Sequence, residues 1–268
     1  MRLFTCPCCS PLSRFASPAD SGSNGGAPRP ASGGKVDPAI LDDLVAANRI
    51  LANEGILDGF GHVSIRHPEH PERYFISRSV APATVTREGL VECDLDSTYC
   101  DPNAPASYLE RYIHGAIYKA RPDVMCVVHS HSPTVIPFAN AKTPLRAMGH
   151  VSGFLAGRVP VFDIKDRFGP TDMLVKNNDH GDALAEVLAD RPVALMRGHG
   201  NVVTGPSVPI AIHRSIYTEV NARQQLQAQS LEGPITYIDE AEGEMCNEMI
   251  AATCERPWKL WKAKIGMA

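Results

Sequence analysis

Residues 124–131 read VMCVVHSH, an apolar run that ends in two histidines separated by one serine. A short apolar run bounded by turn residues is typical of a buried strand. Side chains at positions i and i+2 of a strand lie on one face, so His129 and His131 can direct two imidazoles at one point. The stretch therefore predicts a buried strand that ends in a chelating pair. The alternative is two hydrogen-bonded polar histidines at a strand end.

Helical and extended patterns alternate around this strand. Apolar residues recur at helical spacing in three segments, 37–57, 107–122 and 207–231. Asp37 and Pro38 are preferred residues at the N-cap and the first position of a helix. Further extended segments are expected at 62–66, 73–77 and 192–205, the first two as a hairpin-like pair. Because strands and helices interleave without a linker, we expect one α/β domain over residues 35–268.

Residues 1–34 differ in composition from the rest of the chain. Their second half, SPADSGSNGGAPRPASGG, is rich in Ser, Gly, Pro and Ala and offers almost nothing to bury, which predicts a disordered leader. The first 19 residues contain arginines and no acidic residue, a weak feature of organellar transit peptides, but no amphipathic helix or secretory apolar region. We interpret the CPCC of residues 6–9 as part of a dispensable tail rather than a metal or acylation site, and expect a cytoplasmic protein.

The composition excludes several classes of function. The chain has 268 residues, 44% of them hydrophobic, which suffices for a sizeable core. A formal charge of -4 gives no general attraction to nucleic acid or anionic membranes, and no apolar run is long enough to span a bilayer. The scattered cysteines form no disulfide framework and are expected to be reduced thiols. A small-molecule substrate is therefore expected, with no nucleic-acid or membrane partner.

Two further residues strengthen the metal-site hypothesis. His199 lies between two glycines in RGHGN, where a strand gives way to a loop, and would supply a third imidazole. Three neutral imidazoles with an open position are typical of a catalytic divalent-metal site, for zinc or for manganese. Glu110 lies four residues before His114, so helical spacing would put both on one helix face. Its carboxylate is a candidate acid/base or a further ligand, although a glutamate on a helix is usually a solvated surface residue.

The order of these motifs resembles the class II aldolase/adducin family. It is carried by GFGHVSIR at 59–66, LERYIHGAIYKARPDVMCVVHSHSP at 109–133 and ALMRGHGNVVTG at 194–205, within roughly residues 38–230. The resemblance implies an α/β/α fold with a central, mainly antiparallel sheet, and a homotetramer with active sites at subunit interfaces. It also implies that His129, His131 and His199 bind one divalent metal ion per subunit, Zn²⁺ or Mn²⁺, and that Glu110 is the catalytic acid beside it.

The chain departs from the sugar-phosphate branch of that family. His62 replaces the amide residue that follows the first helix, and residues 77–79 read SRS where a phosphate-binding threonine and glycine are expected. The tyrosine that protonates the aldol substrate has no counterpart in RAMGHVSGF, residues 146–154. This altered pattern resembles the decarboxylase branch, which acts on pyridine dicarboxylates and dihydroxyphthalates.

We therefore expect a metal-dependent carbon–carbon lyase that decarboxylates a hydroxy-substituted aromatic or heteroaromatic carboxylate. Arg78 offers a planar fork suited to a carboxylate, unless an internal acid pairs with it. The candidate substrate-binding residues are His62, Ser77, Arg78, Ser79, Tyr108 and His150. Two alternatives stay open: a metal-dependent aldolase or epimerase on a non-phosphorylated substrate, and a non-catalytic, adducin-like binding module. Trp258 and Trp261, at helical spacing, either cover a neighbouring subunit's site or, as we favour, dock on their own subunit.

Overall fold

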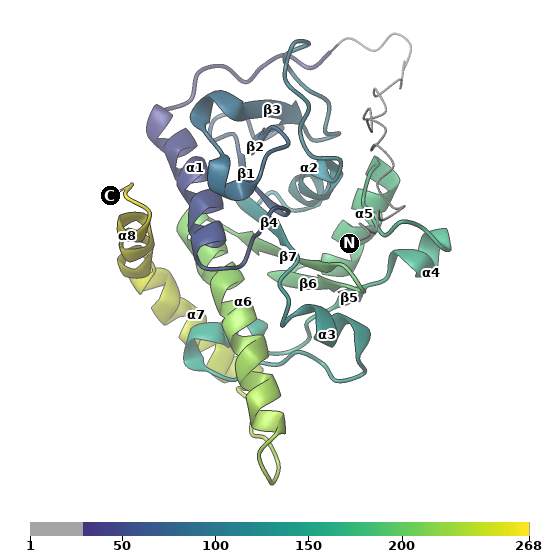
Figure 1. Ribbon diagram of the computed structural model, residues 1–268, viewed down its shortest axis with the longest axis vertical. Helices are drawn as coiled ribbons and strands as arrows, with labels where there is room; N and C mark the ends of the chain where they lie inside the picture. The colour runs from purple at the N-terminus through teal and green to yellow at the C-terminus, as the bar shows by residue number, and fades with distance from the viewer. Residues whose placement is uncertain (1–28, 268) are drawn as a thin grey trace, which may run out of the picture.

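The strand expected before His129 is β4, Cys126–Ser130, at the centre of a seven-stranded sheet (Figure 1). This computed structural model describes residues 29–267. The strand order is β3-β2-β1-β4-β7-β6-β5, and every neighbouring pair is antiparallel except β5 with β6. The other strands are β1 (His62–Arg66), β2 (Arg73–Ser77), β3 (Leu90–Asp94), β5 (Val161–Phe162), β6 (Val193–Met196) and β7 (Gly200–Gly205). The expected mainly antiparallel sheet is confirmed.

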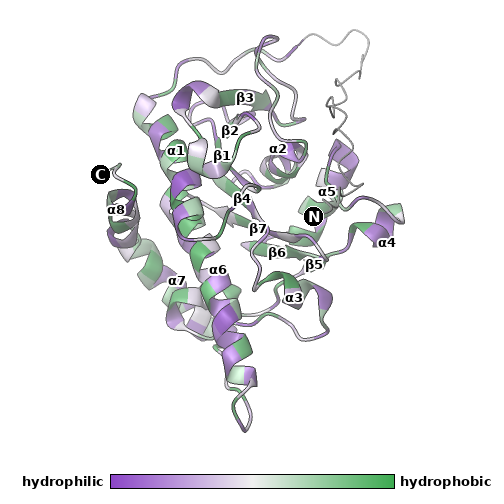
Figure 2. Cartoon of the chain, in the orientation of Figure 1, coloured by the Kyte–Doolittle hydropathy of each residue, from purple (hydrophilic) through white to green (hydrophobic). Residues whose placement is uncertain are grey.

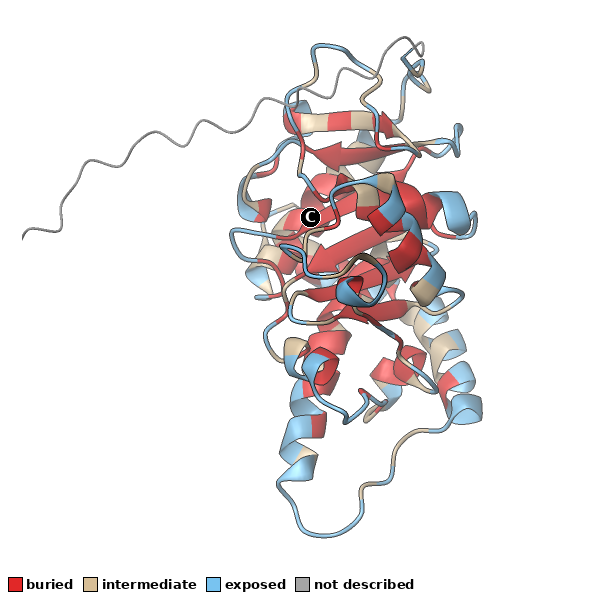
Figure 3. Ribbon diagram, turned by 90° about the vertical axis from the view of Figure 1, so that its right-hand side faces the viewer, coloured by how far each residue is buried: buried red, intermediate tan, exposed pale blue. Residues whose placement is uncertain are grey.

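Helices cover both faces of the sheet, which confirms the α/β/α layers. One layer contains α1 (Pro38–Asn53), α6 (Val208–Gln229), α7 (Glu240–Thr253) and α8 (Glu255–Lys264). The other contains α2 (Arg111–Ala120), α4 (Ile164–Phe168) and α5 (Asn178–Leu188). The short elements α3 (Ile136–Asn140), η1 (Pro82–Thr84), η2 (Arg87–Gly89) and η3 (His150–Leu155) lie in connections. Figure 3 shows the strands buried between helices whose outer surfaces are exposed. Figure 2 shows that the strands are largely hydrophobic.

Alternation along β4 decides which layer the histidines face. Cys126 and Val128 belong to the core shared with α1 and α6, whereas Val127 belongs to the core shared with α2 and α5. Because side chains two residues apart lie on one face of a strand, His129 faces the α2 layer together with Val127. The predicted geometry of the histidine pair thus follows from the period of the strand.

Local sequence signals explain where the first and longest helices begin. The Asp37 side chain accepts a hydrogen bond of 2.9 Å from the Ala39 N–H, and Pro38 is the first helical residue, as predicted. Ser207 caps α6 in the same way through the Ile210 N–H. The predicted segments 37–57 and 207–231 are therefore helices, each slightly shorter than its segment.

The extended segment predicted at 192–205 is two strands rather than one. β6 and β7 are joined by a turn over residues 197–199, in which Gly198 has a φ of 66°, a conformation that favours glycine. A Cβ on Gly200 would lie 2.0 Å from the Ser130 carbonyl oxygen. Gly198 therefore allows the hairpin turn, and Gly200 lets β7 pack closely against β4.

Both ends of the described chain pack against the rest of the domain. Trp258 and Trp261 of α8 are buried in their own subunit, as favoured above. Of the predicted leader, residues 1–28, with CPCC, lie outside the described residues, and residues 29–34 contain no helix or strand. The Gly33 N–H donates to Glu92 Oε1 at 2.7 Å. Among residues 29–267, no helix has the length and apolar character needed to cross a bilayer.

Candidate active site

Four side chains predicted to form a metal site converge at one end of the central strands of the sheet. His129 lies at the end of β4, His131 directly after it, His199 in the β6–β7 turn and Glu110 just before α2. One ligand atom from each of the four lies within 4.8 Å of the other three. His129 opposes Val202 across the β4–β7 pair, and this pairing places the β6–β7 turn beside the histidine pair. The structure thus brings together four residues from three segments, the first and last of which are about 90 residues apart in the sequence.

Backbone carbonyls fix the orientation of two imidazoles. His129 Nδ1 lies 3.2 Å from the Asn201 carbonyl oxygen, and His199 Nδ1 lies 3.0 Å from that of Met173. A carbonyl accepts a hydrogen, so Nδ1 of each ring carries it and the lone pair lies on Nε2. This is the usual arrangement behind histidine ligands of metals.

The facing nitrogens fit a cation. His129 Nε2 and His131 Nε2 are 3.1 Å apart, and His199 Nε2 is buried with Glu110 Oε2 at 3.3 Å. Buried lone pairs that face one another are unfavourable unless a proton or a cation lies between them. Three imidazole nitrogens and a carboxylate are a donor set that zinc and manganese accept.

Glu110 provides the negative charge of the cluster. Its Oε1 accepts a hydrogen bond of 3.0 Å from the Val175 N–H, and its Oε2 lies 3.5 Å from His129 Nε2 and 3.3 Å from His199 Nε2. Burial alone would raise the pKa of Glu110, but the two histidines beside its Oε2 outweigh burial and hold this pKa well below its usual range. Burial, reinforced by His129 and His199, lowers the pKa of His131 to about 4. The carboxylate is therefore ionised among these imidazoles.

The position of Glu110 differs from the helical one predicted. It precedes α2, with φ of -90° and ψ of 17°, because residues 107 and 108 are tied to the end of β2. The Ser107 hydroxyl donates to the Ser77 carbonyl at 2.6 Å, and the Tyr108 hydroxyl donates to the Val80 carbonyl at 2.6 Å. The prediction that Glu110 and His114 lie on one face of the same helix was wrong, because the helix begins only at Arg111.

A cavity of about 550 Å³ adjoins the metal-ligand cluster. Glu110 and His131 connect it to the cluster, and its other polar lining side chains are His62, Ser79 and Tyr108. The apolar lining is provided by Phe60, Val80, Ala81, Leu109 and Leu174. The Tyr108 ring lies 4.6 Å from the His62 ring, measured between centroids. A flat apolar ring with a few polar substituents fits such a lining.

Three of the six predicted substrate contacts lie away from this cavity. Ser77 is buried, and its hydroxyl donates to the Arg78 carbonyl at 2.9 Å. Arg78 is exposed beside Gly89, whose carbonyl accepts its backbone N–H at 2.7 Å. His150 is exposed and lines another cavity, with residues of α6, α7 and α8. Within one chain, His62, Ser79 and Tyr108 therefore line the cavity, whereas Ser77, Arg78 and His150 do not.

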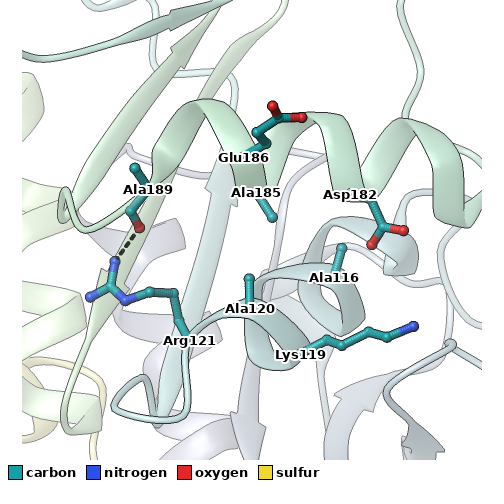
Figure 4. A pocket seen from close by; sticks show the side chains of 8 residues that line it. All are labelled: Ala116, Lys119, Ala120, Arg121, Asp182, Ala185, Glu186 and Ala189. Atoms are coloured by element: carbon teal, nitrogen blue, oxygen red, sulfur yellow. Dashed lines mark hydrogen bonds between the residues drawn. The ribbon is translucent and has the colours of Figure 1, made fainter.

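A further cavity, of about 410 Å³, lies between α2 and α5 (Figure 4). Its floor consists of four alanines, and its charged side chains are Lys119, Arg121, Asp182 and Glu186. Arg121 closes one end by donating to the Ala189 carbonyl at 2.7 Å. Because no histidine or metal-ligand cluster lines it, this cavity offers none of the chemistry of the first.

Sequence analysis missed the residue that holds the turn after His131. Glu219 of α6 is buried and accepts hydrogen bonds from Ser132 Oγ at 2.7 Å and from the Thr134 N–H at 3.1 Å. The Thr134 hydroxyl also donates to it. A glutamate near the middle of a long helix gives no sequence signal of this role, because its partners lie about 85 residues away.

Replacement of Glu219 should destabilise the protein. Glu219→Ala leaves the Ser132 and Thr134 donors without their acceptor, and we expect the free energy of unfolding to fall by about 2–4 kcal/mol. Chemical denaturation measures it, with Glu186→Ala as the control, because Glu186 is exposed and forms a surface ion pair with Arg167. The control should change stability by about 0.5 kcal/mol or less. Equal stabilities of the two variants would contradict a structural role for Glu219.

Comparison with known proteins agrees with this geometry. A decarboxylase of Talaromyces stipitatus, tropJ, is 36% identical over 83% of this chain and 92% of that protein. A 3,4-dihydroxyphthalate decarboxylase of Arthrobacter keyseri is 29% identical over 74% of this chain and 82% of that protein. An aldolase II superfamily protein from Pseudomonas syringae, of known structure, has a TM-score of 0.71 at 24% identity, covering 86% of this chain and 94% of that chain. At this identity the structural likeness shows the fold.

The sequence pattern of the class II aldolase and adducin N-terminal domain matches residues 42–226. This range contains the four converging residues and the whole lining of the adjoining cavity. The match covers more than half of the chain. The protein therefore belongs to the class II aldolase and adducin family.

Proposed function

We propose that this protein is a divalent-metal-dependent decarboxylase of a hydroxy-substituted aromatic or heteroaromatic carboxylate. The observation that carries the proposal is the convergence of three imidazoles and Glu110 beside a cavity with apolar walls. The decarboxylases among its relatives support the same reaction. We assign His129, His131 and His199 as the ligands of one zinc or manganese ion per subunit.

The chemistry requires negative charge to be stabilised near the carbon that loses CO₂. A divalent cation bound by the three histidines would act as a Lewis acid toward an oxygen on the neighbouring carbon. The protein supplies the shape of the cavity and the proton. Leu174 and Tyr108 provide apolar surface for the ring, and His62 and Ser79 provide polar contacts.

Glu110 is the proton carrier in this proposal. Its Oε1 is held by the Val175 N–H, which leaves Oε2 as the reactive oxygen. Oε2 takes the proton of the substrate hydroxyl and delivers it to the ring carbon that bears the carboxylate. The carbon–carboxylate bond then breaks, CO₂ leaves, and the bonding electrons return to the ring. The product carries hydrogen in place of the carboxylate, and Glu110 is again ionised.

We also propose a homotetramer with its active sites at subunit interfaces, located in the cytoplasm. Phe60 and Leu109, on the rim of the cavity, are 67% and 63% exposed, and an adjacent subunit would cover them. The five cysteines in the described part of the chain are free thiols, which fits a reducing compartment. Sedimentation of the purified protein measures its oligomeric state.

Metal analysis and CO₂ release together test the function. The purified protein, loaded with zinc or manganese, should release CO₂ from one member of a panel of hydroxy-substituted benzoates, phthalates and pyridine dicarboxylates. The panel includes 3,4-dihydroxyphthalate, the compound in the name of the Arthrobacter keyseri relative. Bound metal without CO₂ release from any member would favour an aldolase or epimerase on a non-phosphorylated substrate. Failure to bind either metal would refute the catalytic proposal and favour an adducin-like binding module.

A further inference from the structure

A chain of four buried polar side chains runs from the cavity into the interior. His62, in the cavity wall, has its Nδ1 2.6 Å from His114 Nε2. His114 Nδ1 lies 2.6 Å from Ser64 Oγ, which lies 2.8 Å from the Tyr118 hydroxyl. The four side chains are at most 3% exposed. None of the inner three lines the cavity or belongs to the metal-ligand cluster.

The chain follows from the periods of a strand and a helix packed face to face. His62 and Ser64 are two residues apart on β1 and share the face that β1 presents to α2. His114 and Tyr118 are four residues apart on α2 and share the side that faces the sheet. The two pairs therefore alternate in space, and each side chain contacts the next one from the opposite element.

The inner end of the chain sets the direction of its hydrogen bonds. Among the described residues, Ser64 Oγ is the one acceptor in reach of the Tyr118 hydroxyl hydrogen. If Tyr118 donates to Ser64, the Ser64 hydroxyl donates to His114 Nδ1, and His114 Nε2–H donates to His62 Nδ1. The opposite direction would leave the Tyr118 hydrogen buried without an acceptor, which is unfavourable. The favoured direction leaves the hydrogen of His62 on Nε2.

This arrangement gives the cavity a neutral donor. His62 Nε2 has no hydrogen-bond partner among residues 29–267, although His62 lines the cavity. Burial lowers the pKa of His114 to about 3, so this ring is neutral and keeps one hydrogen to donate. A neutral N–H that lines a cavity without a partner is suited to an anionic oxygen of a ligand.

We propose that His114, Ser64 and Tyr118 are positioning residues that hold His62 as an Nε2–H donor to the substrate carboxylate that leaves as CO₂. This inference rests on the proposed decarboxylation. The charge of that carboxylate moves into the ring as the bond breaks, so a cationic partner would stabilise the substrate more than the transition state. A neutral donor avoids that loss, in agreement with the position of Arg78 outside the cavity.

The tautomer can be measured without any activity assay. The zinc-loaded protein, labelled with ¹⁵N-histidine, should show His62 with hydrogen on Nε2 and none on Nδ1, the resonances being assigned by their loss in His62→Gln. Addition of salicylate, a hydroxy-substituted benzoate, should shift the His62 Nε2–H signal. A His62 ring with hydrogen on Nδ1, or a signal that salicylate does not move, would overturn the proposal.

Variants of the inner residues separate positioning from folding. Ser64→Ala removes the donor to His114 Nδ1, and we expect kcat to fall by about 10-fold with unchanged bound zinc, together with a mixed His62 tautomer. Tyr118→Phe removes the hydroxyl that sets the direction of the chain, so we expect this variant to show a mixed His62 tautomer as well, with unchanged bound zinc. A Ser64→Ala variant with the parent's tautomer and kcat would refute the positioning role. The tautomer result stands even if no compound releases CO₂, so failure of the proposed function is distinguished from failure of this inference.

Discussion

His129→Ala should lower the affinity of the protein for zinc or manganese by about 100-fold or more. Loss of a residue that only orients a metal ligand already lowers metal affinity by about 10–100-fold, and loss of a ligand itself should cost at least as much. His129 is the central imidazole, because its Nε2 faces both His131 Nε2 and Glu110 Oε2. Its removal would leave two imidazoles on separate segments, joined only through the carboxylate. CO₂ release should disappear together with the metal.

Metal content after dialysis against a competing chelator measures this loss. His150→Ala is the matched control, because it removes an exposed imidazole that lines a different cavity. The control should keep its metal, and it also tests whether His150 contributes to the metal site from another subunit. A His129→Ala protein with as much metal as its parent would refute the assignment of the cluster.

Glu110→Gln should lower kcat by about 10²–10⁴-fold, the range typical of a lost acid/base group. The amide has nearly the shape of the carboxylate and can still accept the Val175 N–H. It cannot take up a proton and return it, so the transfer to the ring carbon would stop. Because three imidazoles remain, the variant should still bind its metal ion.

Turnover and metal content of this variant must be measured on the same sample. Asp172→Asn is a suitable control, since Asp172 is an exposed carboxylate in the segment that leads to Val175 and pairs with Lys176. Full activity of Glu110→Gln would remove Glu110 from the mechanism. A variant that loses both metal and activity would make Glu110 a ligand and not the proton carrier.

The position of Arg78 bears on how the proposed substrate would be recognised. With Arg78 exposed beside Gly89, no arginine lines the cavity within the described chain. The polar side chains left to contact a ligand are His62 and Ser79, beside the metal-ligand cluster, because the Tyr108 hydroxyl donates to the Val80 carbonyl. In our proposal the leaving carboxylate is therefore recognised by neutral donors, and the bound cation would act on the oxygen of the neighbouring carbon.

The sequence by itself determined what depends on a few consecutive residues. His129 and His131 share a face because the period of a strand is two, and α1 begins at Pro38 because Asp37 caps it. The family was also recognisable, since its motifs are short local segments in a fixed order. These features need no knowledge of where the rest of the chain lies.

Only the tertiary structure decided which residues meet across elements. Glu110 reaches the histidines from a position before α2, where residues 107 and 108 are hydrogen-bonded to Ser77 of β2 and to Val80 after it. His114 contacts His62, and Glu219 holds the turn after His131, through packing between segments 52 and 85 residues apart. Arg78 and His150 point elsewhere for the same reason. The direction of a side chain at a strand end or in a connection depends on the packing of distant elements, which no local periodicity encodes.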